Sequence, residues 1–246
     1  IQYIELSKKI AKIINREDDD SREILKRLLL KRKQIIHKAE NKKSIFEDIL
    51  KEHREKTGSL KYTLVYVPEG NQPDDQGADV FDTIERIKDD EDTIHLINEY
   101  TRIVRDVDSH IVVRQFTSES TDRDAILADF AKGNIDVLTS MKCLDEGVDV
   151  PRSELAIFCA STGNPRQFIQ RRGRILRKHP NKHIAIIHDL VVAPEFDSTE
   201  ENYNMERNLL KGELQRVKDF ARLSENPAFA YTELEEITNY YNLSIF

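Results

Sequence analysis

Five short runs rich in β-branched and aromatic residues alternate with helical stretches in the middle of this 246-residue chain. These runs lie at residues 62–68, 110–117, 135–140, 154–160 and 183–190. Strands that alternate with helices pair in parallel, because a parallel pair needs a crossover connection long enough to hold a helix. The sequence therefore predicts an α/β fold, with a parallel sheet and flanking helices.

Helical spacing of apolar residues marks the segment before the first run. The acidic residues 17–20 separate two predicted helices, and Ser44 with Glu47 matches a capping box that opens a third, which Gly58 can close. We expect residues 1–58 to form a helical arm or linker. It is most simply a solvated helical hairpin.

A second helical region follows Pro194, with its apolar face at Leu209, Leu210, Leu214, Val217 and Phe220. The predicted organisation is therefore an N-terminal arm at 1–58, a sheet domain at 59–192 and a C-terminal helical extension at 193–246. The apolar face is expected to pack on the sheet domain or on a neighbour.

The helix between the second and third runs has clear predicted ends. Thr121 with Asp124 three residues later indicates its start, and Gly133 indicates its end.

Composition restricts where the protein acts and what it binds. The net charge of −7 excludes a polycation that coats nucleic acid, so any anion site is local. Cys143 and Cys159 are predicted core residues in a reducing compartment, which favours an intracellular, cytoplasmic protein of bacterial type. No apolar run is long enough to span a membrane, and Ile1 shows neither an initiator methionine nor a signal peptide, so we expect a piece of a longer protein.

The stretch QFIQRRGRILR at residues 167–177 is strongly basic. Seven Lys or Arg residues and no Asp or Glu lie between Ala160 and His188. Asn164 and Pro165 predict a helix start, Phe168 and Ile169 could anchor the helix in the core, and Gly173 is placed to end it. Arg174 and Arg177 would then lie beyond the helix, at the sheet edge where ligands of open α/β folds bind. The alternative is a solvated helix face.

The spacing of Gln170, Gly173, Arg174 and Arg177 resembles motif VI of superfamily-two helicases, Q-x-x-G-R-x-x-R. The resemblance implies that Gln170, Arg174 and Arg177 face the γ-phosphate of ATP, with both arginines as arginine fingers and Gly173 in the nucleotide site.

The stretch LDEGVDVP at residues 144–151 resembles motif V of the same superfamily. By this resemblance Gly147 allows close approach to the nucleotide or nucleic acid, and Asp149 accepts a hydrogen bond from the ribose or ties its loop to motif VI. Taken alone, the stretch would be an ordinary turn.

Candidate nucleic-acid contacts follow the second run. The resemblance makes Thr117, Ser118 and Ser120 phosphate contacts, although hydroxyl residues at a strand end can equally be caps. Arg171 and Arg172 are either partners of Asp149 and its neighbours or part of a nucleic-acid groove. Met141 and Ser118 depart from the threonine and glycine that family members often carry.

The resemblance covers the second RecA-like lobe, and within the superfamily it is similar to repair helicases of the xeroderma-pigmentosum-B type and to restriction-enzyme motor subunits. It implies a DNA-dependent ATP hydrolase that uses ATP and Mg²⁺. The phosphate loop G-x-x-x-x-G-K-[ST] and the D-E-x-[DH] box are absent from these residues. We therefore expect a first lobe of the same parent chain to supply them, and expect the 246 residues alone to be inactive, with no tightly bound cofactor. An RNA-directed lobe and a non-hydrolysing nucleic-acid-binding scaffold remain alternatives.

Overall fold

The computed structural model describes residues 2–16, 18–39, 41–68, 86–141, 150, 152–160, 165–194 and 200–244. Their contacts divide the chain into two compact units, each described here by itself. One unit is continuous, Glu40–Leu190, and carries the sheet. The other combines Ile1–Ala39 with Val191–Phe246 and is helical. The three-part organisation with boundaries at residues 58 and 192 stays a prediction.

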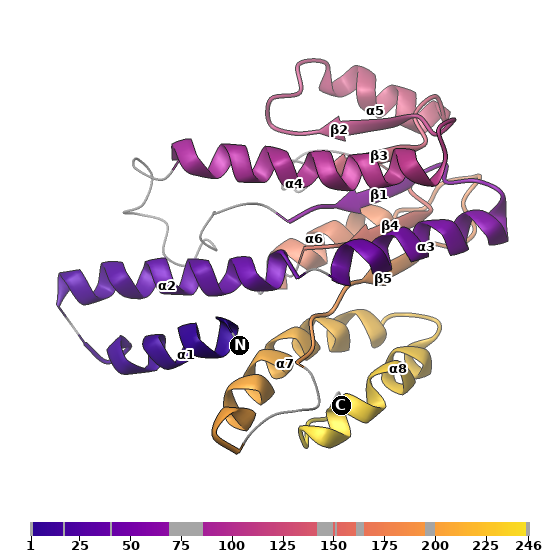
Figure 1. The fold of residues 1–246 in the computed structure, drawn as a ribbon. Coiled ribbons are helices and arrows are strands. Elements are labelled where there is room, and N and C mark those ends of the chain that lie inside the picture. Colours follow the sequence, from indigo (N-terminus) through magenta and orange to yellow (C-terminus); the bar gives the residue numbers. More distant parts are fainter. Residues whose placement is uncertain are drawn as a thin grey trace. The chain divides into compact units, whose positions relative to one another are not determined.

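The sheet has five parallel strands in the order β2-β3-β1-β4-β5 (Figure 1). They are β1 (Thr63–Tyr66), β2 (Val113–Phe116), β3 (Val137–Ser140), β4 (Leu155–Phe158) and β5 (Ile186–Asp189). Each lies within one of the five predicted runs, so the predicted parallel α/β fold is confirmed. The runs extend beyond the strands at one end or at both.

Helices α3 (Asn41–Thr57) and α4 (Arg86–Val107) supply the core on one face of the sheet. Phe46 and Leu50 of α3 are fully buried there with Val65 and Ile157 of the strands. A hydrogen bond of 2.9 Å joins the hydroxyl groups of Thr101 and Thr139 across this layer. Helix α3 is therefore part of the sheet unit.

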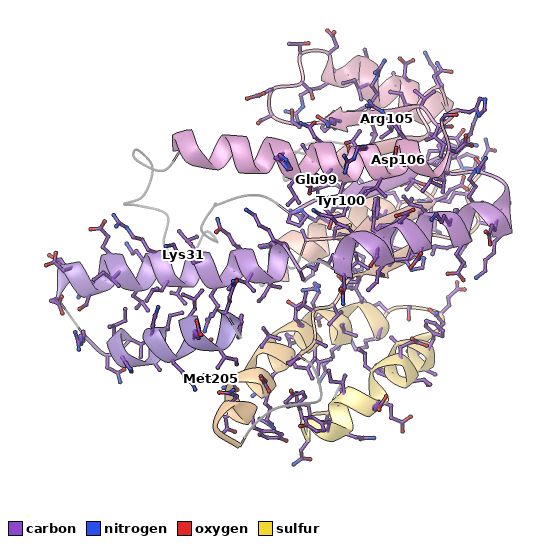
Figure 2. The ribbon with its side chains drawn as sticks, viewed as in Figure 1. Lys31, Glu99, Tyr100, Arg105, Asp106 and Met205 are labelled. Carbon is purple, nitrogen blue, oxygen red and sulfur yellow. The ribbon has the colours of Figure 1, made fainter. Side chains whose placement is uncertain are left out.

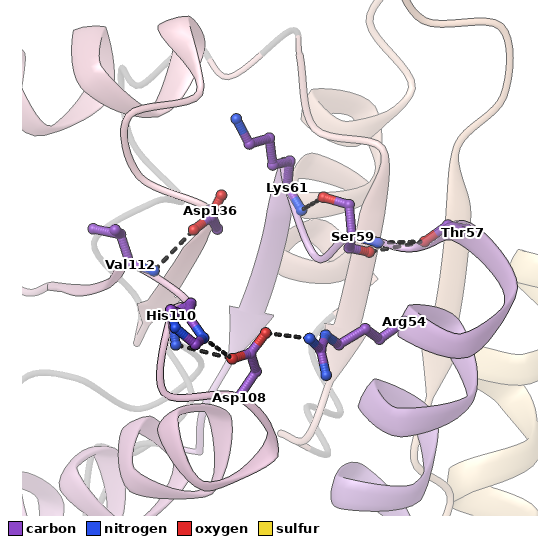
Figure 3. Close-up of polar contacts among 8 residues, drawn as sticks. All are labelled: Arg54, Thr57, Ser59, Lys61, Asp108, His110, Val112 and Asp136. Atoms are coloured by element: carbon purple, nitrogen blue, oxygen red, sulfur yellow. Dashed lines mark hydrogen bonds and ion pairs between the residues drawn. The ribbon is translucent and has the colours of Figure 1, made fainter.

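The carboxyl end of α3 is tied to the end of α4 by charge (Figure 3). Arg54 forms an ion pair with Asp108, whose Oδ1 also accepts the backbone N–H of His110 at 2.9 Å and lies 3.0 Å from the His110 ring Nδ1. Gly58 follows α3 with φ +74°, as predicted for the residue that closes this helix. The predicted start was wrong: α3 begins at Asn41, and the Ser44 hydroxyl donates to the Asn41 carbonyl from inside the first turn.

Side chains on the other face of the sheet form a second layer. Tyr66 and Phe158 stack with ring centroids 4.7 Å apart, and α6 (Pro165–Ile175) places Arg171 over the Tyr66 ring. Phe130 of α5 (Arg123–Lys132) is buried and meets Tyr62 edge to face.

Helix α5 ends as predicted, because Gly133 adopts a left-handed conformation with φ +78°. Its predicted start at Thr121 was wrong. Asp122 is the N-cap residue and its side chain makes no capping hydrogen bond. The preceding turn is closed instead by the Ser120 hydroxyl.

The helical unit contains two pairs of helices. Between α1 (Gln2–Ile13) and α2 (Asp19–His37), Asp18 caps α2 by accepting the Ser21 N–H at 2.8 Å, so the predicted acidic break is confirmed. The apolar face of α7 (Glu200–Ala221) packs Leu210 and Leu214 against Ile237 and Tyr241, at the end of α8 (Pro227–Tyr240). Among the described helices, none combines the length and apolar character that a membrane span requires.

Candidate functional site

The carboxyl ends of all five strands lie at one edge of the sheet. In register across the strands stand Phe116, Ser140, Tyr66, Phe158 and Asp189. The segments that follow these residues carry the predicted site. Loops at this edge are where open parallel sheets present ligand-binding groups.

Helix α6 begins at Pro165, as predicted, but Gly173 does not end it. The helix continues to Ile175, and the Leu176 N–H still bonds to the Arg172 carbonyl at 3.0 Å. Glycine permits a left-handed end without requiring one, and here the chain keeps its helical hydrogen bonds. Arg174 therefore lies within the helix, and only Arg177 lies beyond it.

The longer helix contains two of the three motif VI catalytic positions. Gln170 and Arg174 are four residues apart in α6 and share a helix face, whereas Arg177 lies two residues beyond its end, where its N–H bonds to the Arg174 carbonyl at 3.4 Å. The side chain of Gln170 lies outside the described part of the structure, whereas Arg174 is half-buried and Arg177 exposed. The structure thus places Gln170 and Arg174 in α6 and Arg177 just after it, and their catalytic roles stay predictions.

The remaining α6 residues divide between the core and solvent. Arg171 is only 5% exposed, with its guanidinium carbon 5.3 Å from the Tyr66 ring centroid, while Arg172 is half-buried. Ile169 is 47% exposed, so the predicted anchoring role of this residue was wrong. Phe168 has no described side chain, and the predicted cap Asn164 lies outside the described residues.

A lysine fixes the carboxyl end of α6. The Lys182 ammonium donates to the Ile175 carbonyl at 2.6 Å, at the end of the helix where the backbone dipole attracts cations. Partial burial lowers the pKa of Lys182.

The predicted motif V residues Gly147 and Asp149 lie outside the described residues, as does Cys143. Met141, which precedes them, packs against the α3–α4 side of the core. That contact accounts for an apolar side chain where family members often carry threonine.

The predicted phosphate contacts follow β2. Ser118 is exposed, but the Ser120 hydroxyl accepts the Thr117 N–H at 2.9 Å, and the Ser120 N–H returns to the Thr117 carbonyl at 3.2 Å. The Ser120 hydroxyl therefore stabilises a local turn, in keeping with the alternative that these residues act as caps. Contact of Thr117, Ser118 and Ser120 with nucleic acid stays a prediction.

The structure does not bring the predicted phosphate contacts after β2 together with the predicted catalytic residues of α6. Thr117 follows the edge strand β2, while α6 follows β4, and β3 and β1 lie between them. With neighbouring strands about 4.8 Å apart, three steps separate the sets by roughly 14 Å. They occupy different stretches of one edge, as two different ligands require.

Two buried residues lie at this edge: Cys159, which was predicted to be a core residue, and Lys42, which was not predicted to be buried. Cys159, directly after β4, is fully buried as predicted, and burial raises the pKa of its thiol to about 12. Lys42 is 4% exposed, and nothing in its sequence context distinguishes it from Lys43 beside it. No group of three or more His, Cys, Asp or Glu side chains suited to a metal ion occurs in the portion of the chain that is described.

Comparison with known proteins gives three similarities. Residues 80–179 match the helicase conserved C-terminal domain. The chain is 41% identical over 76 residues to the DNA 3'-5' translocase XPB2 of Sulfurisphaera tokodaii, covering 31% of this chain and 17% of that protein. It is 29% identical over 126 residues to an uncharacterised protein of Mycobacterium leprae, covering 50% of this chain and 21% of that one.

Among solved structures, the fold is similar to that of T4 UvsW, with a TM-score of 0.50 and 15% identity over 87% of this chain and 37% of UvsW. The chain thus aligns with about a fifth of the length of the curated relatives it matches first.

Proposed function

We propose that this chain, whose residues 80–179 match the helicase conserved C-terminal domain, is the second, RecA-like motor lobe of an ATP-dependent DNA translocase or helicase of superfamily two. In this proposal α6 supplies Arg174, and the residues just after it supply Arg177, to ATP held between this lobe and a first lobe of the parent protein.

The observation that supports the proposal is that Gln170 and Arg174 share a face of α6 and that Arg177 follows two residues after its end. Hydrolysis of the terminal phosphoryl group builds negative charge on its oxygens, and guanidinium groups stabilise that charge. The run from Ala160 to His188 contains seven Lys or Arg residues and no Asp or Glu, so this segment of the sequence is positively charged. Gly147, Asp149 and Gly173 remain proposed residues of the nucleotide site.

The other half of the reaction belongs to the proposed first lobe. A phosphate loop cradles the nucleotide, and Mg²⁺ held by acidic residues neutralises phosphoryl charge. This sequence contains neither motif, so we assign it the arginine half only. The 246 residues alone are therefore expected to hydrolyse ATP negligibly.

Nucleic acid is proposed to lie along the same sheet edge, nearer β2. Thr117 and Ser118 are the proposed phosphate contacts, and Arg172 of α6 is a further candidate. A contact through Ser120 would require its turn to open, and a contact through Arg171 would require this side chain to leave the Tyr66 ring. Backbone contacts carry no sequence information, so weak sequence preference is expected. The DNA translocase named among the relatives favours DNA over RNA.

The test is alanine substitution in the parent protein. Arg174→Ala and Arg177→Ala should each lower kcat for ATP by about 10³-fold or more, because an arginine finger contributes roughly that factor or above. Affinity for duplex DNA should change little. Lys178→Ala removes the neighbouring exposed cation and is the matched control, with turnover expected to be unchanged.

Undiminished turnover in both arginine variants would falsify the finger roles. Stronger ATPase stimulation by RNA than by duplex DNA would instead support the RNA-directed alternative.

A further inference from the structure

Lys42 is a buried cation in the first turn of α3. Its side chain is 4% exposed, and its ammonium donates to the Cys159 carbonyl at 3.0 Å. Lysine is almost never fully buried without a partner, because removing its charge from water is costly. This position therefore calls for a specific explanation.

The neighbouring Cys159 thiol does not provide that explanation. Burial raises the thiol pKa to about 12 although Lys42 opposes the shift, so the thiol is protonated and neutral at pH 7. The hydroxyl of Tyr100, a fully buried residue of α4 labelled in Figure 2, also hydrogen-bonds this thiol and is neutral, because burial raises its pKa too. Asp189 at the end of β5 is the acidic group that acts on the same thiol. The hydrogen bond from Lys42 to Cys159 is to the backbone carbonyl, so it fixes a point of the main chain.

That point is where the chain leaves the sheet towards the arginine helix. Cys159 directly follows β4, and α6 begins at Pro165. A hydrogen bond from a charged donor is stronger than one between neutral groups. It therefore holds the first residue of the β4–α6 connection in a defined place.

Lys42 also lies at a boundary of the sheet unit, which starts at Glu40. It belongs to the first turn of the first element after that boundary. We propose that Lys42 is a positioning residue that joins the start of the sheet unit to the β4–α6 connection, so that movement of the incoming chain is transmitted to Arg174 and Arg177. The catalytic part of this inference rests on the function proposed above.

Lys43 provides a matched control in the same turn. It forms an ion pair with Glu99 of α4, and its side chain is 40% exposed. Replacing either lysine by methionine removes one positive charge and keeps the aliphatic length. Only Lys42→Met removes the bond to Cys159.

Hydrogen exchange on the 246-residue chain tests the positioning role without ATP. Lys42→Met should accelerate amide exchange in residues 159–175 by about 10- to 100-fold, while exchange in α5 changes little. Lys43→Met should leave both regions close to wild type. If Lys42→Met proves unstable, Lys42→Gln shortens the side chain out of reach and should give the same local pattern.

Unchanged exchange in residues 159–175, or equal acceleration throughout the sheet unit, overturns the inference. In the parent protein, Lys42→Met should lower kcat at least tenfold with little change in KM for ATP. A fall in kcat no larger than that of Lys43→Met refutes transmission to the arginines. Local acceleration together with full activity of the Arg174 and Arg177 variants would instead reject the finger roles and leave the positioning role standing.

Discussion

Gly133 is the residue whose replacement should most clearly reveal a steric constraint in the sheet unit. Its φ of +78° is left-handed, and a Cβ built there would lie 2.7 Å from the Tyr62 hydroxyl oxygen and 3.3 Å from Cζ of that ring. The ring is held by Arg152, whose guanidinium carbon is 4.1 Å from its centroid, and by Phe130 at 6.1 Å. Gly133→Ala therefore imposes both a backbone cost and a collision.

The two costs can be separated with Gly58. That glycine has nearly the same φ, +74°, with no heavy atom within 4 Å of a built Cβ. Gly58→Ala should lower the free energy of unfolding by about 1 kcal/mol, the left-handed penalty less the entropy lost by the unfolded chain. Gly133→Ala should cost about 1–2 kcal/mol more, because the tyrosine must leave its preferred position.

Urea denaturation followed by far-ultraviolet circular dichroism measures both values. In a Tyr62→Phe background the hydroxyl is gone, so the extra cost of Gly133→Ala should fall to a few tenths of a kcal/mol, and the double-mutant cycle reports the difference as coupling. Equal costs at Gly58 and Gly133, or an extra cost that persists without the hydroxyl, would refute the steric argument.

Two further predictions concern single side chains. Gly173→Ala and Gly212→Ala place a methyl group in open space on helices α6 and α7, so each should stabilise the chain by roughly 0.5–1 kcal/mol in the same denaturation assay; destabilisation by either would contradict this. Hydrogen bonds from the backbone amide of His110 and from its ring, and the Arg54 charge, lower the pKa of Asp108. The stability that the Asp108 carboxylate contributes is therefore present above its unfolded pKa near 3.8, and it is lost as the pH falls through the lower folded pKa. Asp108→Asn should flatten the stability profile in that acidic range, and an unaltered profile would argue against the network in Figure 3.

Sequence patterns located the strands well because β-branched content reflects burial on both faces of a parallel sheet. They were less successful where one residue type has two structural uses. Gly133 and Gly173 look alike in sequence, yet only the first turns left-handed, since the chain after Gly173 continues its helical hydrogen bonds. The outcome depends on tertiary contacts that local sequence does not encode.

The candidate site was predictable to a similar extent. The stretch that holds Gln170, Arg174 and Arg177 was predicted to contain one helix, and the structure has Gln170 and Arg174 within α6 and Arg177 just beyond it. Burial of Arg171 over Tyr66 depends on a strand more than 100 residues away, as does the bond from Lys42 to Cys159. No periodicity within a segment reports contacts of that sequence separation.

The continuity of the sheet unit has a consequence for how such a module can be exchanged between proteins. Near its beginning, Lys42 bonds to the Cys159 carbonyl, and at its end the Leu190 N–H bonds to the Phe158 carbonyl at 3.0 Å. Both ends are thus bonded to consecutive residues, the last of β4 and the one that follows it. A module whose entry and exit lie close together can be inserted into a host chain at a single surface loop, without separating the segments of the host on either side. The sheet unit therefore begins and ends close to one point at the end of β4, as a module inserted at a single loop must.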